Sequence, residues 1–147
     1  MRTAMLAEHD VVLLDTSAAI ALIVEDHEAH AVTLELLRGR RLGLSGHAWF
    51  ETYSVLTRLP GWQRRSAADA ARIIAHNFPA TGFLGESASL DLGPELARLG
   101  ISGGAVYDAL VGAAARQHGR RLASGDLRAR PIYEALGVDL VVIGGPN

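Results

Sequence analysis

Short hydrophobic segments alternate along the chain with longer segments in which hydrophobic residues recur every three or four positions. The run Val11-Val12-Leu13-Leu14 is hydrophobic at every position, as is typical of a central parallel strand buried on both faces. Weaker strand signals follow at residues 42–44, 81–84, 121–124 and 140–143. Because these signals alternate with helical segments, the pattern predicts an α/β fold. A parallel β-sheet would be flanked by helices in three layers, α/β/α.

The segments between the predicted strands have the periodicity and end signals of helices. Ser45 and Ser66 are suited to cap the helices that follow them. Pro94 interrupts one helical segment, so we expect that helix to begin late, near residues 90–93. Helices are expected over residues 18–24, 28–38, 48–58, 67–77, 90–99, 105–117 and 131–136.

Length and composition fit one domain with a substantial core. The 147 residues, 49% of them hydrophobic, are enough to bury a core without disulfides. We expect a single domain over residues 1–147, with its core between about residues 11 and 143. The chain has no cysteine, which excludes a disulfide framework, a thiolate metal site and a cysteine nucleophile.

All 14 basic residues are arginine, and this narrows the possible functions. Without lysine the chain cannot form a phosphate-binding P-loop, a Schiff base or a protein-kinase active site. The net charge of -2 argues against a broadly basic nucleic-acid-binding domain but leaves room for a local basic rim.

Membrane and targeting signals are weak in this sequence. The longest hydrophobic run near the start, Ala18 to Val24, is far shorter than the 18 or more residues of a membrane span. The first ten residues contain Glu8, His9 and Asp10 and lack a hydrophobic signal core. We therefore expect a soluble, cytoplasmic protein with no membrane partner.

Four acidic residues occur where an exposed acid is not expected. Asp15 ends the most hydrophobic strand, and Asp126 follows a predicted strand. Glu51 lies among aromatic residues in a largely hydrophobic helix, and Asp108 is the only acid between residues 101 and 125. Because ligands of parallel α/β sheets bind at the carboxyl ends of the strands, we expect these four carboxylates to converge.

Four neighbouring carboxylates repel one another, and a hard divalent cation relieves this repulsion. Mg²⁺ prefers oxygen ligands and commonly takes one or two carboxylates together with water. Such clusters serve metal-assisted displacement at a phosphodiester. Thr16 and Ser17 add hydroxyl groups beside the first acid. Each acid also has a purely structural interpretation, as a helix cap, a helix-start acid, a turn residue or an exposed side chain.

At these residues the chain resembles the PIN-domain ribonucleases, and within them the VapC-type toxins of toxin–antitoxin pairs. The resemblance covers nearly the whole chain and lies in the ordered set of four acids. The matching segments read VVLLDTSA from Val11, HAWFETYSVLTRL from His47, YDALV from Tyr107, LASGDLR from Leu122 and YEALGV from Tyr133.

The resemblance implies a Mg²⁺-dependent endoribonuclease, with Mn²⁺ as a substitute. Asp15 and Asp108 match the direct metal ligands, and Glu51 and Asp126 match the acids that complete the pocket. Thr16 or Ser17 matches the hydroxyl beside the first acid. The family also implies a homodimer, neutralisation by a cognate VapB-type antitoxin, and contact with operator DNA through the antitoxin only.

Two arginines follow the last acid closely and are candidates for substrate binding. Arg128 and Arg130 can hold an RNA phosphate through paired N–H donors. They are equally suited to be solvated charges at the start of a helix.

Two other functions remain open. One is a PIN-like binding module without catalytic activity, although such proteins typically lose one or more of the acids. The other is a phosphatase resembling the haloacid dehalogenases, which also places an aspartate after the first strand. That class needs a second aspartate two positions later, where this chain has Ser17, and it normally uses a lysine.

Overall fold

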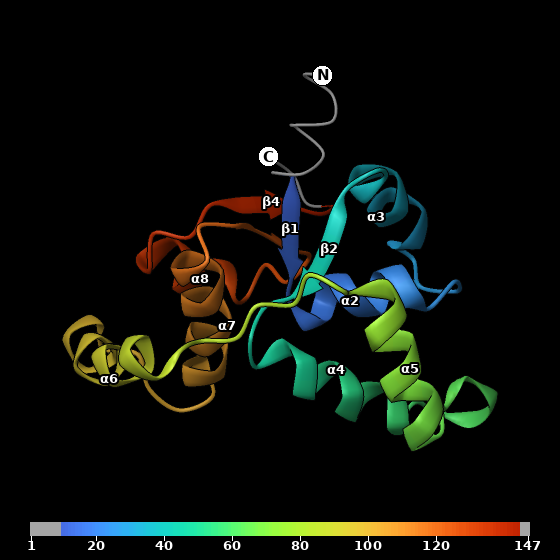
Figure 1. Cartoon of the computed structure of the whole chain (residues 1–147), viewed down its shortest axis with the longest axis horizontal. Helices are drawn as coiled ribbons and strands as arrows, with labels where there is room; N and C mark the ends of the chain where they lie inside the picture. Colours follow the sequence, from blue (N-terminus) through green and yellow to red (C-terminus); the bar gives the residue numbers. More distant parts are fainter. Residues whose placement is uncertain (1–9, 145–147) are drawn as a thin grey trace.

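The computed structural model describes residues 10–144. The predicted domain also included residues 1–9 and 145–147, which lie outside the described residues. Within the described part, four parallel strands form one sheet in the order β2-β1-β3-β4. Helices cover both faces of this sheet (Figure 1), which confirms the predicted α/β/α layers. The strands are β1 (Val11–Leu14), β2 (Arg41–Leu44), β3 (Arg121–Ser124) and β4 (Leu140–Val142).

The helices follow the predicted segments closely. A short 3₁₀ turn, Gly61–Gln63, lies between the helices Ala48–Thr57 and Ala67–Asn77. The helices are α2 (Thr16–Ile23), α3 (His30–Leu37), α4 (Ala48–Thr57), α5 (Ala67–Asn77), α6 (Glu86–Leu99), α7 (Ala105–Gln117) and α8 (Arg130–Ala135). No helix in the described part of the chain is long and hydrophobic enough to cross a membrane.

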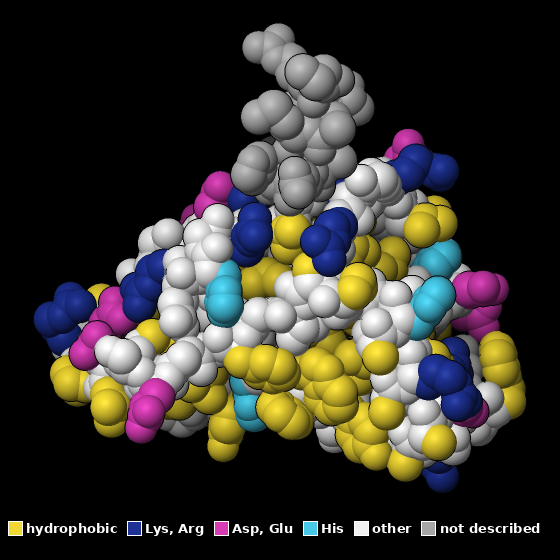
Figure 2. All heavy atoms as spheres, in the orientation of Figure 1, with side chains coloured by type: hydrophobic (Ala, Val, Ile, Leu, Met, Phe, Trp, Pro, Cys, Tyr) yellow, Lys and Arg dark blue, Asp and Glu magenta, His cyan; other side chains and the backbone are white. Residues whose placement is uncertain are grey.

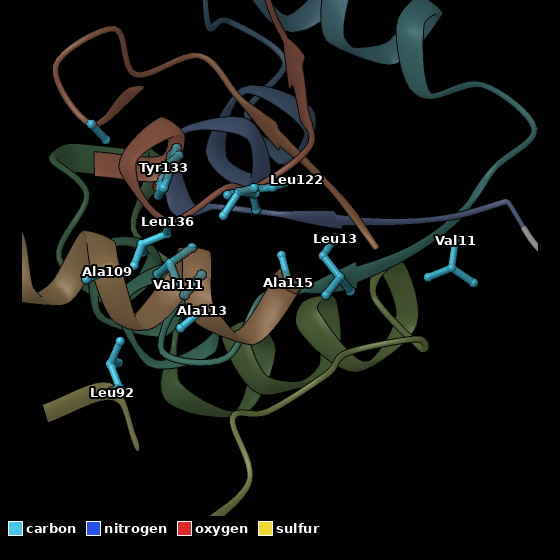
Figure 3. Packing of buried hydrophobic residues seen from close by; sticks show 13 residues of the cluster. Val11, Leu13, Leu92, Ala109, Val111, Ala113, Ala115, Leu122, Tyr133 and Leu136 are labelled. Atoms are coloured by element: carbon cyan, nitrogen blue, oxygen red, sulfur yellow. The ribbon is translucent and has the colours of Figure 1, made fainter. Parts of the chain in front are cut away.

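Alternate residues of β1 divide the core into two halves. Val11 and Leu13 pack with residues of α6, α7 and α8, as Figure 3 shows for Leu13 beside α7. Val12 and Leu14 pack on the opposite face with residues of α2, α3, α4 and α5. Because all four β1 residues are buried, the strand lies at the centre of the sheet, as its hydrophobic run predicted.

The register of the strands places their carboxyl ends side by side. Leu14 pairs with Leu44 of β2 and with Ala123 of β3. The chain then leaves the sheet at Asp15 after β1 and at Gly125 after β3. Polar residues that follow these strands are therefore brought to one edge of the sheet.

The prediction of a strand over residues 81–84 is wrong. Only an isolated bridge forms there, between Gly82 and Ser45. The amide of Leu44 donates instead to the side chain of Thr81, at 3.0 Å, so a hydroxyl interrupts the backbone ladder. Gly43 permits the close approach, because a Cβ at that position would come within 2.2 Å of the Ala80 carbonyl oxygen.

One predicted helix start and one predicted helix cap also need correction. Helix α6 begins at Glu86 and continues through Pro94, so the proline does not delay its start. The carbonyl left without an amide donor belongs to Leu90, which is 73% exposed, and solvent can satisfy it. Ser45 does not cap α4, because its hydroxyl donates to the carbonyl of Val111 at 2.6 Å. Ser66 does cap α5 and accepts from the amide of Asp69.

Candidate active site

All four predicted acids line one cleft at the carboxyl ends of the strands. Asp15 follows β1, Glu51 lies in the first turn of α4, Asp108 in the first turn of α7, and Asp126 in the loop after β3. The complete lining is Asp15, Thr16, Ser17, Glu51, Asp108, Val111, Asp126, Arg128 and Tyr133. Carboxylates from four separate segments thus share one small volume.

Asp15 caps helix α2 and also faces this cleft. Its Oδ1 accepts from the Ala18 amide at 3.0 Å and from the Ser17 hydroxyl at 2.6 Å. Its Oδ2 accepts from the Tyr133 hydroxyl at 2.9 Å. The residue is only 3% exposed, and this burial raises the pKa of Asp15, an effect that the hydrogen bonds partly offset. Asp15 therefore caps α2, as its structural interpretation predicted, and its carboxylate also lines the cleft, whereas its functional role stays a prediction.

Glu51 is held toward the cleft from two sides. The Thr16 hydroxyl donates to its Oε2 at 3.3 Å. His47 Nε2 lies 3.6 Å from Oε1, one helical turn earlier on the same element. Glu51 is more open to solvent than the other acids, with 40% of its side chain exposed. It is therefore suited to contact water or a ligand from the rim.

Asp108 and Asp126 are joined by a single arginine. Arg128 Nη2 lies 3.3 Å from Asp126 Oδ2, and its Nη1 lies 3.9 Å from Asp108 Oδ2. Asp126 Oδ1 also accepts from the backbone amides of Arg128 and Ala129, which fixes the loop after β3. The Arg128 side chain is 76% exposed, so its guanidinium can leave the acids without losing buried contacts.

Arg130, the second predicted phosphate-binding residue, does not line the cleft. Its Nε lies 3.7 Å from Glu134 Oε2, one turn later on α8. The structure thus places Arg128 in the cleft with the acids and Arg130 outside the cleft. The substrate role of both arginines stays a prediction.

Tyr133 is the site residue that the sequence reasoning missed. It lies on α8, is 2% exposed and donates its hydroxyl to Asp15. Burial, followed by the charge of Asp15, raises the pKa of Tyr133, so the phenol stays protonated and remains a donor. A signal did exist, because a tyrosine at a hydrophobic helix position needs a buried hydrogen-bond partner.

The cleft carries an excess of negative charge near Asp108. Burial is the main cause that raises the pKa of Asp108, and the charges of Asp126, Glu51 and Asp15 raise it further. The Arg128 guanidinium acts in the opposite direction. One exposed cation therefore faces four acids, and the balance of charge favours binding of a further cation.

The donor set fits a hard divalent cation. Four carboxylates line the cleft, and hydroxyls from Thr16 and Ser17 lie beside them. Among residues 10–144, no three His, Asp or Glu side chains are gathered tightly enough to enclose a metal ion on their own. This arrangement suits Mg²⁺, which binds through one or two carboxylates and keeps several waters.

The fold and the four acids define a known class. Residues 12–135 match the PIN domain family, a span that contains every acid of the cleft. The chain belongs to the PIN-domain family.

Within that family, the chain is similar to proteins of the VapC group. It is 47% identical over 129 residues to Ribonuclease VapC27 of Mycobacterium tuberculosis. That match covers 88% of this chain and 94% of VapC27. This chain is 38% identical over 131 residues to Ribonuclease VapC40 of the same species, covering 88% and 96%. The chain thus belongs to the VapC group, as its resemblance predicted.

Solved structures share the fold at low sequence identity. VapBC2 from Rickettsia felis, bound to a DNA fragment from its promoter, matches with a TM-score of 0.63 and 15% identity, over 90% of this chain and 98% of that chain. FitAcB from Neisseria gonorrhoeae matches with a TM-score of 0.61 and 17% identity, over 88% and 95%. At these identities the likeness establishes the fold alone.

Proposed function

We propose that this protein is a Mg²⁺-dependent endoribonuclease, with Mn²⁺ as a substitute, and the toxin of a type II toxin–antitoxin pair. One observation carries the proposal. Asp15, Glu51, Asp108 and Asp126 line a single cleft in a chain that is 47% identical to a protein named as a ribonuclease.

Asp15 and Asp108 are the residues best placed to hold the metal ion. Both are less exposed than Glu51, and burial raises the pKa of each, so a cation would relieve an existing electrostatic cost. A bound Mg²⁺ supplies Lewis-acid stabilisation of phosphoryl oxygens and lowers the pKa of a coordinated water. Glu51 and Asp126, which are more exposed, would orient water at the rim.

The hydroxyls of the cleft organise the acids. Ser17 donates to Asp15 and also accepts from the amide of Gly125, so it links the ends of β1 and β3. Thr16 orients Glu51 from the first turn of α2. Arg128 is exposed and pairs with Asp108 and Asp126, so its guanidinium is free to exchange a carboxylate for an RNA phosphate.

The direct test is cleavage of a structured RNA pool by the purified protein. We expect cuts with Mg²⁺ or Mn²⁺, none with EDTA, and none with Asp15→Asn. Metal-independent cutting, or equal cutting by the variant, would contradict the proposal. Failure of the wild type both to cut and to bind Mn²⁺ would instead support a catalytically inactive PIN-like module.

The toxin role has a cellular test, in which the protein acts on RNA in the cytoplasm. Expression alone should arrest growth, whereas expression of Asp108→Asn should not. Co-expression of a cognate VapB-type antitoxin should restore growth. The named VapBC complexes among the structural neighbours support such a partner, and one of them is bound to promoter DNA. For this protein we propose contact with operator DNA only through the antitoxin. Equal toxicity of the variant would indicate a different cause.

An aromatic surface beside the cleft supports a homodimer. Three aromatic side chains on this surface are each about half exposed. They are Phe50 of α4 at 56%, Phe83 before α6 at 49% and Tyr107 of α7 at 53%. His47 stacks on Tyr107, and the rings of Phe50 and Phe83 lie 6.0 Å apart. Figure 2 shows hydrophobic side chains gathered along the lower edge of the molecule, around α4 in the orientation of Figure 1. Exposed hydrophobic patches of this kind mark interaction surfaces.

Sedimentation measurements test this surface. The wild type should sediment as a dimer, and Phe50→Ser should shift it toward the monomer. A wild-type monomer at micromolar concentration would contradict the dimer and leave the nuclease assignment in place.

A further inference from the structure

The hydroxyl of Tyr133 makes a buried contact for which the fold alone gives no need. A phenylalanine would fill the same space on α8, yet the chain carries a hydroxyl that donates to Asp15 Oδ2 at 2.9 Å. The other oxygen, Oδ1, has its own donors in Ser17 and the Ala18 amide. Each oxygen of Asp15 therefore has its own donors, and Tyr133 donates to Oδ2.

Tyr133 also contacts the helix that carries the second metal-binding candidate. A Cβ built at Gly112 of α7 would come 3.1 Å from Tyr133 Cδ1, so the ring lies directly on the backbone of α7. Gly112 is one helical turn after Asp108 on the same helix. Figure 3 shows Tyr133 of α8, and Leu136 directly after α8, above Ala109 and Val111 of α7.

Tyr133 is also connected to Asp126, through the backbone of the segment that joins them. Tyr133 is seven residues after Asp126, and α8 begins directly after the loop that Asp126 closes by hydrogen bonds. Tyr133 thus donates to Asp15 and packs on the helix that carries Asp108. It also lies on the helix that follows the Asp126 loop. Movement of the ring would change the spacing of these acids.

We propose that Tyr133 is a positioning residue, whose hydroxyl fixes the Asp15 carboxylate in the orientation that receives the divalent cation. This inference rests on the proposed function. Hydrogen-bond partners of metal-binding carboxylates typically contribute 10- to 100-fold to metal affinity. The effect arises because a tethered carboxylate does not have to be reoriented when the ion binds.

The test is calorimetric titration of the full chain with Mn²⁺ at 25 °C. Tyr133→Phe keeps the ring and removes only the hydroxyl, and we expect the Kd for Mn²⁺ to rise about tenfold or more. The matched control is Ile74→Val, a fully buried position on α5 in the other half of the core. This control loses stability by a comparable amount and should bind Mn²⁺ like the wild type.

A second variant keeps the hydroxyl and displaces the ring. Gly112→Ala places a methyl group 3.1 Å from Tyr133 Cδ1, so we expect a smaller loss of Mn²⁺ affinity than for Tyr133→Phe. This variant decides the matter if Tyr133→Phe does not fold.

The outcomes separate this inference from the proposed function. Wild-type affinity in Tyr133→Phe, or an equal loss in Ile74→Val, would overturn the positioning role and leave the metal site standing. Wild-type affinity in Gly112→Ala would do the same where Tyr133→Phe does not fold. Absence of Mn²⁺ binding by the wild type would overturn both.

Discussion

Strand β1 has an aspartate at each end, and the two lie in opposite electrostatic surroundings. Asp10, before the strand, accepts from Arg40 at 2.6 Å and from Arg121 at 3.3 Å. Asp15, after the strand, accepts from neutral donors, among them Ser17, Ala18 and Tyr133. Three further acids and a single exposed arginine share its cleft.

The comparison shows how a structural acid differs from a candidate functional one. Two arginines balance Asp10, so the structure alone accounts for its charge. At the other end of the sheet, negative charge exceeds positive charge, and the pKa of Asp15 and that of Asp108 are raised, mainly by burial. An unbalanced cluster of this kind favours the binding of a cation, as proposed for this cleft.

The largest expected effect separates the two aspartates by activity. Asp15→Asn should lower the rate of RNA cleavage about 100-fold or more, since loss of a proposed metal ligand should cost at least as much as loss of one of its hydrogen-bond partners. Asp10→Asn, the same chemical change at the other end of the strand, should leave the rate unchanged. Equal losses in both variants would show that the difference between the two ends has no functional meaning.

Metal binding should stabilise the folded protein through the cleft alone. At a Mn²⁺ concentration one hundred times its Kd, the gain is about 2.7 kcal/mol, which raises Tm by roughly 5–10 °C. Asp10→Asn should show the same rise in differential scanning fluorimetry, and Asp15→Asn should show little. A rise that persists in Asp15→Asn would place the metal elsewhere.

The sequence predicted that the four acids converge at one edge of the sheet better than it predicted the ends of individual helices. The hydrophobic run before Asp15 and the helical periodicity around Glu51 and Asp108 were enough to bring the acids together. Residues 81–84 were misassigned because Thr81 replaces a backbone partner through its side chain, which periodicity cannot show. Tyr133 was missed because its contact with Asp15 spans 118 positions and depends on how α8 packs.

The pH dependence of stability should differ between the wild type and Asp15→Asn in EDTA. Burial raises the pKa of Asp15 above its ordinary value of 3.8, so the folded state binds this proton more tightly than the unfolded state does. The group therefore adds stability at low pH, and this contribution is lost as pH rises from about 4 through the raised pKa.

Thermal melts across this range provide the check. The Tm of the wild type minus that of Asp15→Asn should fall as pH increases. A difference that rises with pH would mean that Asp15 is stabilised as a carboxylate without metal.

A smaller effect, on stability, is expected at the other end of β1, where Asp10 pairs with two arginines. Asp10→Asn removes two ion pairs whose partners are partly buried, with 28% of the Arg40 side chain exposed. We expect a loss of about 1 kcal/mol and a fall in Tm of roughly 2–4 °C. A loss near zero, measured by urea denaturation, would show that Asp10 does not contribute to the fold.

The smallest expected effect concerns the one arginine in the cleft. Arg128→Ala removes the cation that bridges Asp108 and Asp126, so the affinity for Mn²⁺ should rise about two- to fivefold, as for loss of an exposed pair. The KM for RNA should rise if Arg128 also holds phosphate. Arg130→Ala, whose arginine pairs with Glu134 outside the cleft, is the matched control and should leave Mn²⁺ affinity unchanged.

The most direct test of the central claim is an anomalous difference map from crystals of this protein grown with Mn²⁺. The account predicts a strong peak in the cleft, bonded to carboxylate oxygens of Asp15 and Asp108, and none at Asp10. A map whose strongest peak lies away from these two acids, at full metal occupancy, would contradict the account.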